Sequence, residues 1–350
     1  MKVNLYIKKI LPNMIVHWVD NGEIVASRGY TLYVSKDSET FRKLVNIRIP
    51  PLYKVISHSR LLSRALRLGI RALLKLKNGD ILLIANGKMF LHSKGASHMV
   101  YSFEHGVGPL RDGLCEDDNG NIYIGEYFPN NSRKHPVRLL KSEDGGRSWE
   151  VLQSFKNIRH IHCVQYDPYE KLLWMGTGDR DEESKIMFSE DYGETWNVMG
   201  SGNQMFRTVT LLFTEEYVYW GTDTPARQSY IYRYIRKRKE VERLTPVSGP
   251  VYCSTILENG IKVFSTGAEG NSEGKSAAWD NKAHIWASLD GVKYEDVISF
   301  EKDSWPYILG YGRIIFPRGQ KSKMLIFTTQ CLKNNDNTSF MAYLSGNGNH

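Results

Sequence analysis

The chain has 350 residues, of which 41% are hydrophobic and 12% aromatic, enough to bury one large core or several smaller ones. Lys and Arg number 46 against 38 Asp and Glu, a net charge of +8 that suits an anionic partner without identifying one. No run approaches ~18 apolar residues, and no RNA-binding signature or zinc-finger spacing occurs. The sequence therefore favours neither a membrane span nor a nucleic-acid partner.

The N-terminal segment predicts a strand rather than a targeting signal. Its short apolar runs are broken by Lys8, Lys9 and Pro12, and no small-residue cleavage site follows them. Four cysteines are scattered without a CxxC pair, and three of them lie in apolar runs, where a buried free thiol is the expectation. We expect a soluble, cytoplasmic protein, with export by an unread route left open.

Residues 57–71 carry leucines between arginines at helical spacing, namely Arg60, Arg64, Arg67 and Arg71. This pattern predicts a short amphipathic helix near residues 57–68, inserted between repeats. A solvated helix is the main expectation, and weak contact of its basic face with an anionic membrane is the alternative. Upstream, Arg48-Ile49-Pro50 resembles an Arg-Ile-Pro element of sialidases, but it follows the first repeat instead of preceding it, so we give it no weight.

Two stretches share the pattern Ser-x-Asp-x-Gly-x-x-Trp and lie 47 residues apart, from Ser142 to Ser189. They read KSEDGGRSWEVL, from Lys141, and FSEDYGETWNVM, from Phe188. Degenerate copies occur at Ser35 and Ser288, each displaced by close to twice that period. Strand–turn–strand segments without the motif lie near residues 90 and 235, and a last unit spans 324–344. The spacing predicts seven repeats.

Each repeat opens with an apolar strand, a turn such as Asn-Gly or Asp-Pro, and an alternating strand, as in GLCEDDNGNIYIGEY. Two further strands flank the Ser-x-Asp turn. Four-stranded units of ~40–50 residues are blades of a β-propeller. We therefore predict an all-β fold, a seven-bladed β-propeller that forms a single domain over residues 1–350. Residues 2–9 are expected to supply the outer strand of the last blade.

The motif resembles the Asp-box (BNR) repeat of sialidase-like propellers. The resemblance implies that each box lies in the hairpin between the third and fourth strands, where the Asp bonds the turn and the Trp packs between sheets. Asp144 and Asp191 stand one blade apart, so they cannot form a catalytic pair, which needs carboxylates within ~5–10 Å. The boxes are expected to be structural.

Functional side chains are expected on the opposite face, just before each innermost strand and just after each second strand. The candidate catalytic residues are His160, His162, Arg207 and Tyr127. The candidate substrate-binding residues are Arg159, Gln204, Arg111, Asp179, Asp223 and Trp305. Polar residues collected from separate blades onto one rim are what an axial pocket requires.

Within this set, His160 and His162 stand two apart on a predicted strand, so their side chains are expected on the same side. Either histidine could act as acid or base, or be a packed strand residue. A metal would need a third ligand, such as Gln204 or an acid. Arg159 and Arg207 suit a ligand carboxylate, or equally a salt bridge to Asp179 or Asp223.

The resemblance implies a carbohydrate-active enzyme that cleaves an acidic, uronate- or sialate-like glycan, as a polysaccharide lyase or a glycoside hydrolase. In a lyase an arginine would neutralise the uronate carboxylate, while a His or Tyr removes the adjacent proton. The alternative is a non-catalytic propeller that binds a glycan or a protein. We expect no cofactor, with a divalent metal ion left open, and an acidic oligosaccharide or polysaccharide as partner.

Overall fold

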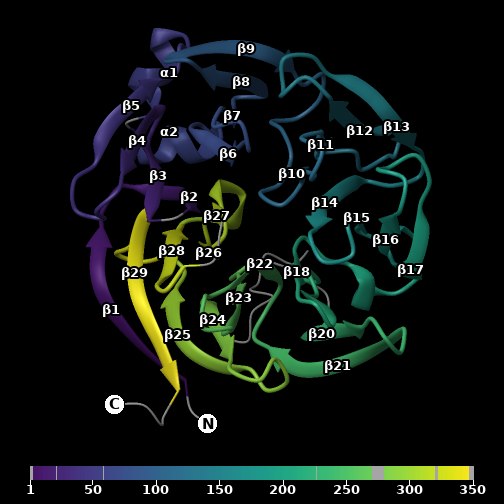
Figure 1. Cartoon of the computed structure of the whole chain (residues 1–350). Coiled ribbons are helices and arrows are strands. Elements are labelled where there is room, and N and C mark those ends of the chain that lie inside the picture. The colour runs from purple at the N-terminus through teal and green to yellow at the C-terminus, as the bar shows by residue number, and fades with distance from the viewer. Residues whose placement is uncertain are drawn as a thin grey trace. The chain divides into compact units, whose positions relative to one another are not determined.

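A computed structural model describes residues 3–20, 22–57, 59–225, 227–269, 280–319 and 322–346. The strands form seven sheets in which hydrogen-bonded neighbours run largely in chain order (Figure 1). The fold is a seven-bladed β-propeller of four-stranded antiparallel sheets, which confirms the predicted fold class. One blade carries a short fifth strand that pairs in parallel with its innermost strand.

The blades are numbered along the chain, with strands given from the innermost outward. Blade 1 contains β2 (Ile15–Asp20), β3 (Glu23–Arg28), β4 (Thr31–Ser35) and β5 (Arg42–Asn46), with the added strand β27 (Arg318–Gly319). Blade 2 contains β6 (Ile70–Lys75), β7 (Ile81–Ala85), β8 (Lys88–Ser93) and β9 (Ala96–Ser102). Blade 3 contains β10 (Leu114–Glu116), β11 (Ile122–Gly125), β12 (Val137–Ser142) and β13 (Glu150–Phe155).

Blade 4 contains β14 (His160–Asp167), β15 (Leu172–Gly178), β16 (Lys185–Ser189) and β17 (Asn197–Ser201). Blade 5 contains β18 (Leu211–Phe213), β19 (Tyr217–Gly221), β20 (Ser229–Ile235) and β21 (Glu240–Val247). Blade 6 contains β22 (Val251–Ile256), β23 (Lys262–Thr266), β24 (Lys282–Ser288) and β25 (Glu295–Glu301). Blade 7 contains β26 (Arg313–Ile315), β28 (Leu325–Gln330), β29 (Thr338–Gly346) and β1 (Val3–Leu11).

Helical segments are few and short. They are the α-helices α1 (Pro51–Ile56) and α2 (Arg60–Ala65) and the 3₁₀ turns η1 (Asp181–Glu183), η2 (Gln204–Phe206) and η3 (Tyr307–Leu309). The predicted helical insertion is present, but it begins at Pro51, earlier than expected, and consists of two short helices. Arg67 lies beyond α2 with a positive φ of 52°, and Arg71 lies in strand β6, so the predicted helical run of arginines stops after Arg64. No helix in the described ranges is long and apolar enough to cross a membrane.

The chain divides into two compact units. The first comprises residues 1–46, 54–66 and 219–350, and the second comprises 47–53 and 67–218. In the first unit, the core packs strands of blades 6 and 7 together and includes Phe316, Phe327 and Phe340. In the second unit, a core between blades 3 and 4 includes Tyr123, Ile161 and Met175. Cys115, Cys163 and Cys253 are buried free thiols, as predicted.

The N-terminal strand forms the outer edge of the last blade. β1 pairs antiparallel with β29, from Val3 opposite Gly346 to Leu11 opposite Ser339, and the two strands run side by side in Figure 1. The described part of the predicted segment, residues 3–9, therefore lies where the repeat count places it, while residue 2 is outside the described residues. Closing a blade with a strand from the other end of the chain removes an unpaired sheet edge.

The four Ser-x-Asp motifs lie between the third and fourth strands of blades 1, 3, 4 and 6, and their hydrogen bonds are local. In blade 3, the Asp144 carboxylate accepts from the backbone N–H groups of Arg147 and Ser148, both at 2.9 Å. The buried Ser142 hydroxyl donates to Asp144 and accepts from Gly146 N–H. The Trp149 indole donates to Gly146 O at 3.1 Å. The carboxylates are therefore turn-forming groups.

Candidate functional site

Side chains from five loops and strand ends of the second unit gather around Asp179. Arg159 and His160 lie at the start of β14, and Asp179 directly follows β15. Gln204 lies in η2, Arg207 precedes β18, and Tyr127 follows β11. These are the positions before innermost strands and after second strands that the repeat pattern selected. The structure thus brings together seven of the ten predicted site residues, with His162 on the same strand as His160.

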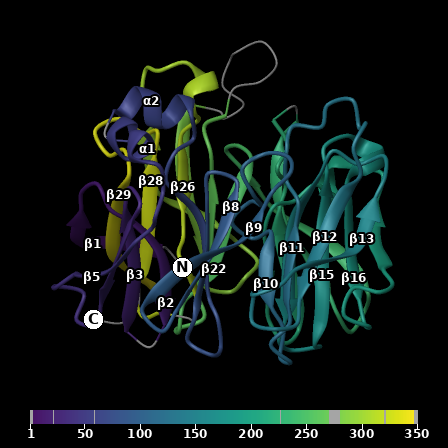
Figure 2. The same cartoon turned by 90° about the horizontal axis from the view of Figure 1, so that it is seen from above.

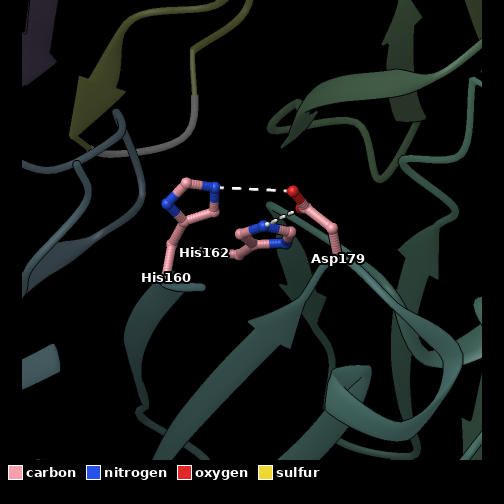
Figure 3. A group of neighbouring side chains, drawn as sticks. All are labelled: His160, His162 and Asp179. Atoms are coloured by element: carbon pink, nitrogen blue, oxygen red, sulfur yellow. Dashed lines mark hydrogen bonds and ion pairs between the residues drawn. The ribbon is translucent and has the colours of Figure 1, made fainter. Parts of the chain in front are cut away.

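Asp179 is the centre of the group, which we call the Asp179 cluster and define as Arg159, His160, His162, Asp179 and Arg207. Figure 3 shows the two histidines with Asp179. Arg159 Nη1 lies 2.5 Å from Asp179 Oδ2, and Arg207 Nη2 lies 3.2 Å from Oδ1. His162 Nε2 lies 3.0 Å from Oδ1, and His160 Nε2 lies 3.5 Å from Oδ2. Four nitrogen-bearing side chains therefore converge on one carboxylate.

The position of His162 depends on an irregularity of β14. The pairing of β14 with β15 shifts register between Ile161 and Cys163, so His162 is the extra residue of a β-bulge. Bulges re-aim side chains and are common next to functional sites. Gly178 completes the arrangement, since a Cβ there would lie 2.6 Å from His162 Cε1. Glycine at 178 is therefore required for the imidazole to fit.

A second layer of contacts supports the cluster, and no sequence pattern selects its residues. Glu183 accepts from Arg133 Nε at 2.6 Å and from the backbone N–H groups of Arg159 and Asp179. Gln204 donates to the Asp179 carbonyl at 2.9 Å. Glu183 belongs to the acidic run DRDEE after β15, but Arg133 comes from a different loop, so only the fold pairs them.

Both histidines are enclosed and neither presents a free nitrogen to solvent. Their side chains are 3% and 2% exposed, for His160 and His162 respectively. His160 Nδ1 donates to Phe128 O at 2.8 Å, and its ring stacks on Tyr127 with centroids 4.1 Å apart. His162 Nδ1 is buried and has no hydrogen-bond partner among the described residues. An acid or base needs access to substrate, which this packing does not provide.

The charge states follow from these contacts. Burial lowers the pKa of His162 and outweighs the opposing hydrogen bond to Asp179, so this imidazole is neutral near pH 7 and its Nε2–H donates to Asp179. Burial alone would raise the pKa of the Asp179 carboxyl, but hydrogen bonds from both histidines and the charge of Arg207 hold it well below its usual range. With Arg159 and Arg207 cationic and Asp179 anionic, the cluster keeps an excess of positive charge.

The cluster also contains the donor set of a metal site. Ligand atoms of His160, His162 and Asp179 lie within 4.8 Å of one another. The carboxylate, however, is already engaged by the two guanidinium groups, one on each oxygen. A divalent cation there would face two fixed positive charges at short range. The residues therefore fit a bound anion better than a metal ion.

The remaining predicted site residues have other neighbours. Arg111 pairs with the adjacent Asp112 at 2.5 Å. Trp305, expected to stack on a sugar, lies in the first unit under the guanidinium groups of Arg60 and Arg64, at 4.9 and 4.7 Å from its ring centroid. Asp223, also in the first unit, is buried, and its charge helps to raise the pKa values of Tyr252 and Tyr311.

These two tyrosines belong to a second polar group, in the first unit. Tyr252 is the bulge residue of β22, and its hydroxyl donates to Glu269 at 2.5 Å. Its ring stacks on Tyr311 with centroids 5.2 Å apart, and Arg313 lies over the Tyr311 ring. Burial, followed by the charge of Glu269, raises the pKa of Tyr252 well above its usual value. Tyr252 and Glu269 are not among the ten site residues predicted from the sequence, and their pairing depends on the fold.

No family model matches the sequence, and no curated protein matches it. Solved structures match the fold at low identity. The WD40 β-propeller domain of Doa1 is 12% identical, with a TM-score of 0.59 over 98% of both chains. YCF48 bound to D1 peptide is 9% identical, with a TM-score of 0.58 over 97% of this chain and 96% of that one. A chain of the mitotic checkpoint complex is 8% identical, with a TM-score of 0.56 over 96% and 93%. These likenesses establish the propeller fold.

Proposed function

We propose that this chain is a binding propeller whose Asp179 cluster holds a ligand carboxylate. The observation that carries the proposal is that the guanidinium groups of Arg159 and Arg207 both contact the Asp179 carboxylate. One carboxylate balances only one of the two cations, so the cluster keeps an excess positive charge. Arg159 keeps a third of its side chain exposed, while its Nε is buried and has no hydrogen-bond partner among the described residues. A carboxylate is the group whose two oxygens match a guanidinium.

In this arrangement Asp179 and Glu183 position the donors for the ligand. Asp179 orients both guanidinium groups, and Glu183 fixes the backbone of Arg159 and Asp179. The two histidines fill the space behind the carboxylate, which supports binding rather than proton transfer. Donors held in place before binding lose little entropy when the ligand arrives, so a modest contact area can yield useful affinity.

An acidic oligosaccharide is the first ligand class to test, because Tyr127 places a half-buried aromatic ring beside the cluster and its His160 stacking fixes that ring. An acidic peptide shares the same carboxylate chemistry. One solved propeller of the same fold is bound to a peptide, which supports binding as the function class. The Ser-x-Asp hairpins support, as a further part of this proposal, a relationship to Asp-box propellers.

Cleavage of an acidic glycan is a second proposal, and the Tyr252–Glu269 pair favours it. A carboxylate that accepts the tyrosine proton can activate the phenol oxygen as a nucleophile. Burial and the charge of Glu269 raise the pKa of Tyr252, so the phenol stays protonated at rest, and Glu269 is the group placed to accept its proton as the oxygen attacks.

The test titrates the full chain with uronic-acid oligosaccharides, their neutral counterparts and acidic peptides, while product formation is followed by mass spectrometry. We expect saturable binding of carboxylate-bearing ligands that weakens as salt increases, with no product formed. Binding of neutral and acidic ligands with equal affinity would overturn the binding proposal. Product formation that is lost in Tyr252→Phe would instead establish the second proposal.

A further inference from the structure

One guanidinium group of the first unit has no anionic partner. Arg313 begins β26, the innermost strand of blade 7, and Figure 2 shows β29, β28 and β26 in a row. Its Nε donates to Gln330 Oε1 on β28 at 2.8 Å. Within the described part of the chain, neither Nη atom donates a hydrogen bond and no carboxylate forms an ion pair with the group. A half-buried arginine ordinarily has such a partner, because its charge is costly to remove from water.

The backbone beside Arg313 is held by the neighbouring blade. Ala268, which follows β23 of blade 6, forms an isolated antiparallel bridge with Gly312, with N–H to O distances of 2.8 and 3.2 Å. The Ser265 hydroxyl on β23 also donates to Ile314 O at 2.7 Å. These bonds fix the start of β26 against blade 6. A ligand of Arg313 therefore meets a backbone that is already ordered, which lowers the entropy cost of binding.

Two tyrosine rings limit where the guanidinium group can lie. The guanidinium carbon of Arg313 is 5.7 Å from the centroid of the Tyr311 ring, and Tyr311 stacks on Tyr252. The Tyr252 hydroxyl donates to Glu269, which holds this ring in turn. Gly267 leaves the space that the Tyr252 ring occupies, since a Cβ there would lie 2.3 Å from the ring carbon Cε2. The side chains around the guanidinium group are thus fixed, while its two Nη atoms stay available to an anion.

We propose that Arg313 is the centre of a second ligand site, which binds the carboxylate of an organic acid through its two Nη atoms. A carboxylate is planar, and its two oxygens match the guanidinium nitrogens. A phosphate would bring a second negative charge and further oxygens into a group that already holds the Glu269 carboxylate, so it fits less well. The proposal depends neither on the Asp179 cluster, which belongs to the other unit, nor on any reaction of Tyr252.

The test uses the full chain carrying Arg159→Ala, so that the Asp179 cluster contributes little. Calorimetry compares a uronic-acid disaccharide with the same disaccharide whose acid is reduced to the alcohol. Adding Arg313→Ala should weaken binding of the acid by about 10- to 100-fold and leave binding of the alcohol unchanged. Arg313→Lys keeps the charge but loses the planar pair of donors, so its affinity for the acid should lie between the two. The control is Arg243→Ala, at an exposed position on β21 of the same unit, which should change neither.

Thermal unfolding shows whether each variant is folded, and Arg313→Lys, which keeps the aliphatic stem, serves if Arg313→Ala is not. Unchanged binding of the acid in the Arg313 variants would overturn the proposal, as would equal losses for the acid and the alcohol. Stronger competition by inorganic phosphate than by acetate would overturn the assignment of a carboxylate. Loss of all acid binding in Arg159→Ala alone would also overturn it, because the Asp179 cluster would then be the acid's binding site. Acid binding that ignores Arg159→Ala but is lost in Arg313→Ala would instead contradict the function proposed for the Asp179 cluster and support this one.

Discussion

At the scale of single residues, the Ser-x-Asp hairpins show how one hydroxyl organises a turn. Ser142 is buried, donates to Asp144 and accepts from Gly146 N–H at 2.9 Å. Removing the hydroxyl leaves that N–H without its partner. Ser142→Ala should therefore lower the free energy of unfolding by about 1–2 kcal/mol, measured by urea denaturation. The control is Ser154→Ala, at an exposed position on the adjacent strand β13, which should change the free energy of unfolding little. Equal effects of the two substitutions would contradict the role of the Ser142 hydroxyl in the turn.

His284 gives a pH dependence whose sign is fixed by its neighbours. Burial opposes its charge, but hydrogen bonds to Asp296 at 2.7 Å and Asp280 at 3.0 Å outweigh burial and raise its pKa above 6.5. Protonation therefore stabilises the folded chain below pH 6.5, and this contribution disappears as the pH rises through the folded-state pKa.

The measurement is the melting temperature of wild type and His284→Gln as a function of pH. The melting temperature of the wild type should exceed that of His284→Gln by most near pH ~6, and the difference should shrink toward pH ~9. His92→Gln is the control of opposite sign, since burial lowers the pKa of His92, so its charging in acid favours unfolding. A constant difference between wild type and His284→Gln across this range would contradict the assignment.

At the scale of elements, the closure of blade 7 makes the first strand essential to the last. β1 covers the edge of β29 over nine residues, including the buried Val3. A chain lacking residues 1–11 should melt at lower temperature and self-associate through the exposed edge. Adding a peptide of residues 1–11 should restore the melting temperature, whereas the same peptide with Leu5→Pro should not. Unchanged thermal unfolding and size-exclusion profiles for the shortened chain would contradict this account.

The elements were predictable to different degrees. The hairpins of all seven blades follow from apolar alternation and turn residues, as for β8–β9 and β20–β21, where the box motif is absent. The extent of the helical insertion could not be predicted, because Arg71 continues the helical spacing of arginines but belongs to strand β6. The bulge at His162 could not be predicted either, because it depends on the register in which β14 pairs with β15. The alternation of residues along one strand does not show this register.

At the scale of the whole molecule, the repeat pattern predicted which loops carry the candidate site. Knowing the blade order was enough to group His160, Asp179 and Arg207, which are far apart in sequence. It was not enough to pair Arg133 with Glu183, or to give Trp305 its arginine neighbours, because those contacts depend on loop conformations. The enclosure of both histidines, on which the binding proposal relies, also could not be read from the sequence.

The most direct test of the central claim measures one ligand in two forms, as the carboxylate and as its carboxamide, by calorimetry with wild type and Arg159→Ala. Arg159→Ala should weaken the acid by about 10- to 100-fold while changing the amide little. Arg180→Ala, next to the cluster but 62% exposed, should change neither. Equal losses for the acid and the amide in Arg159→Ala would contradict recognition of a carboxylate at the Asp179 cluster.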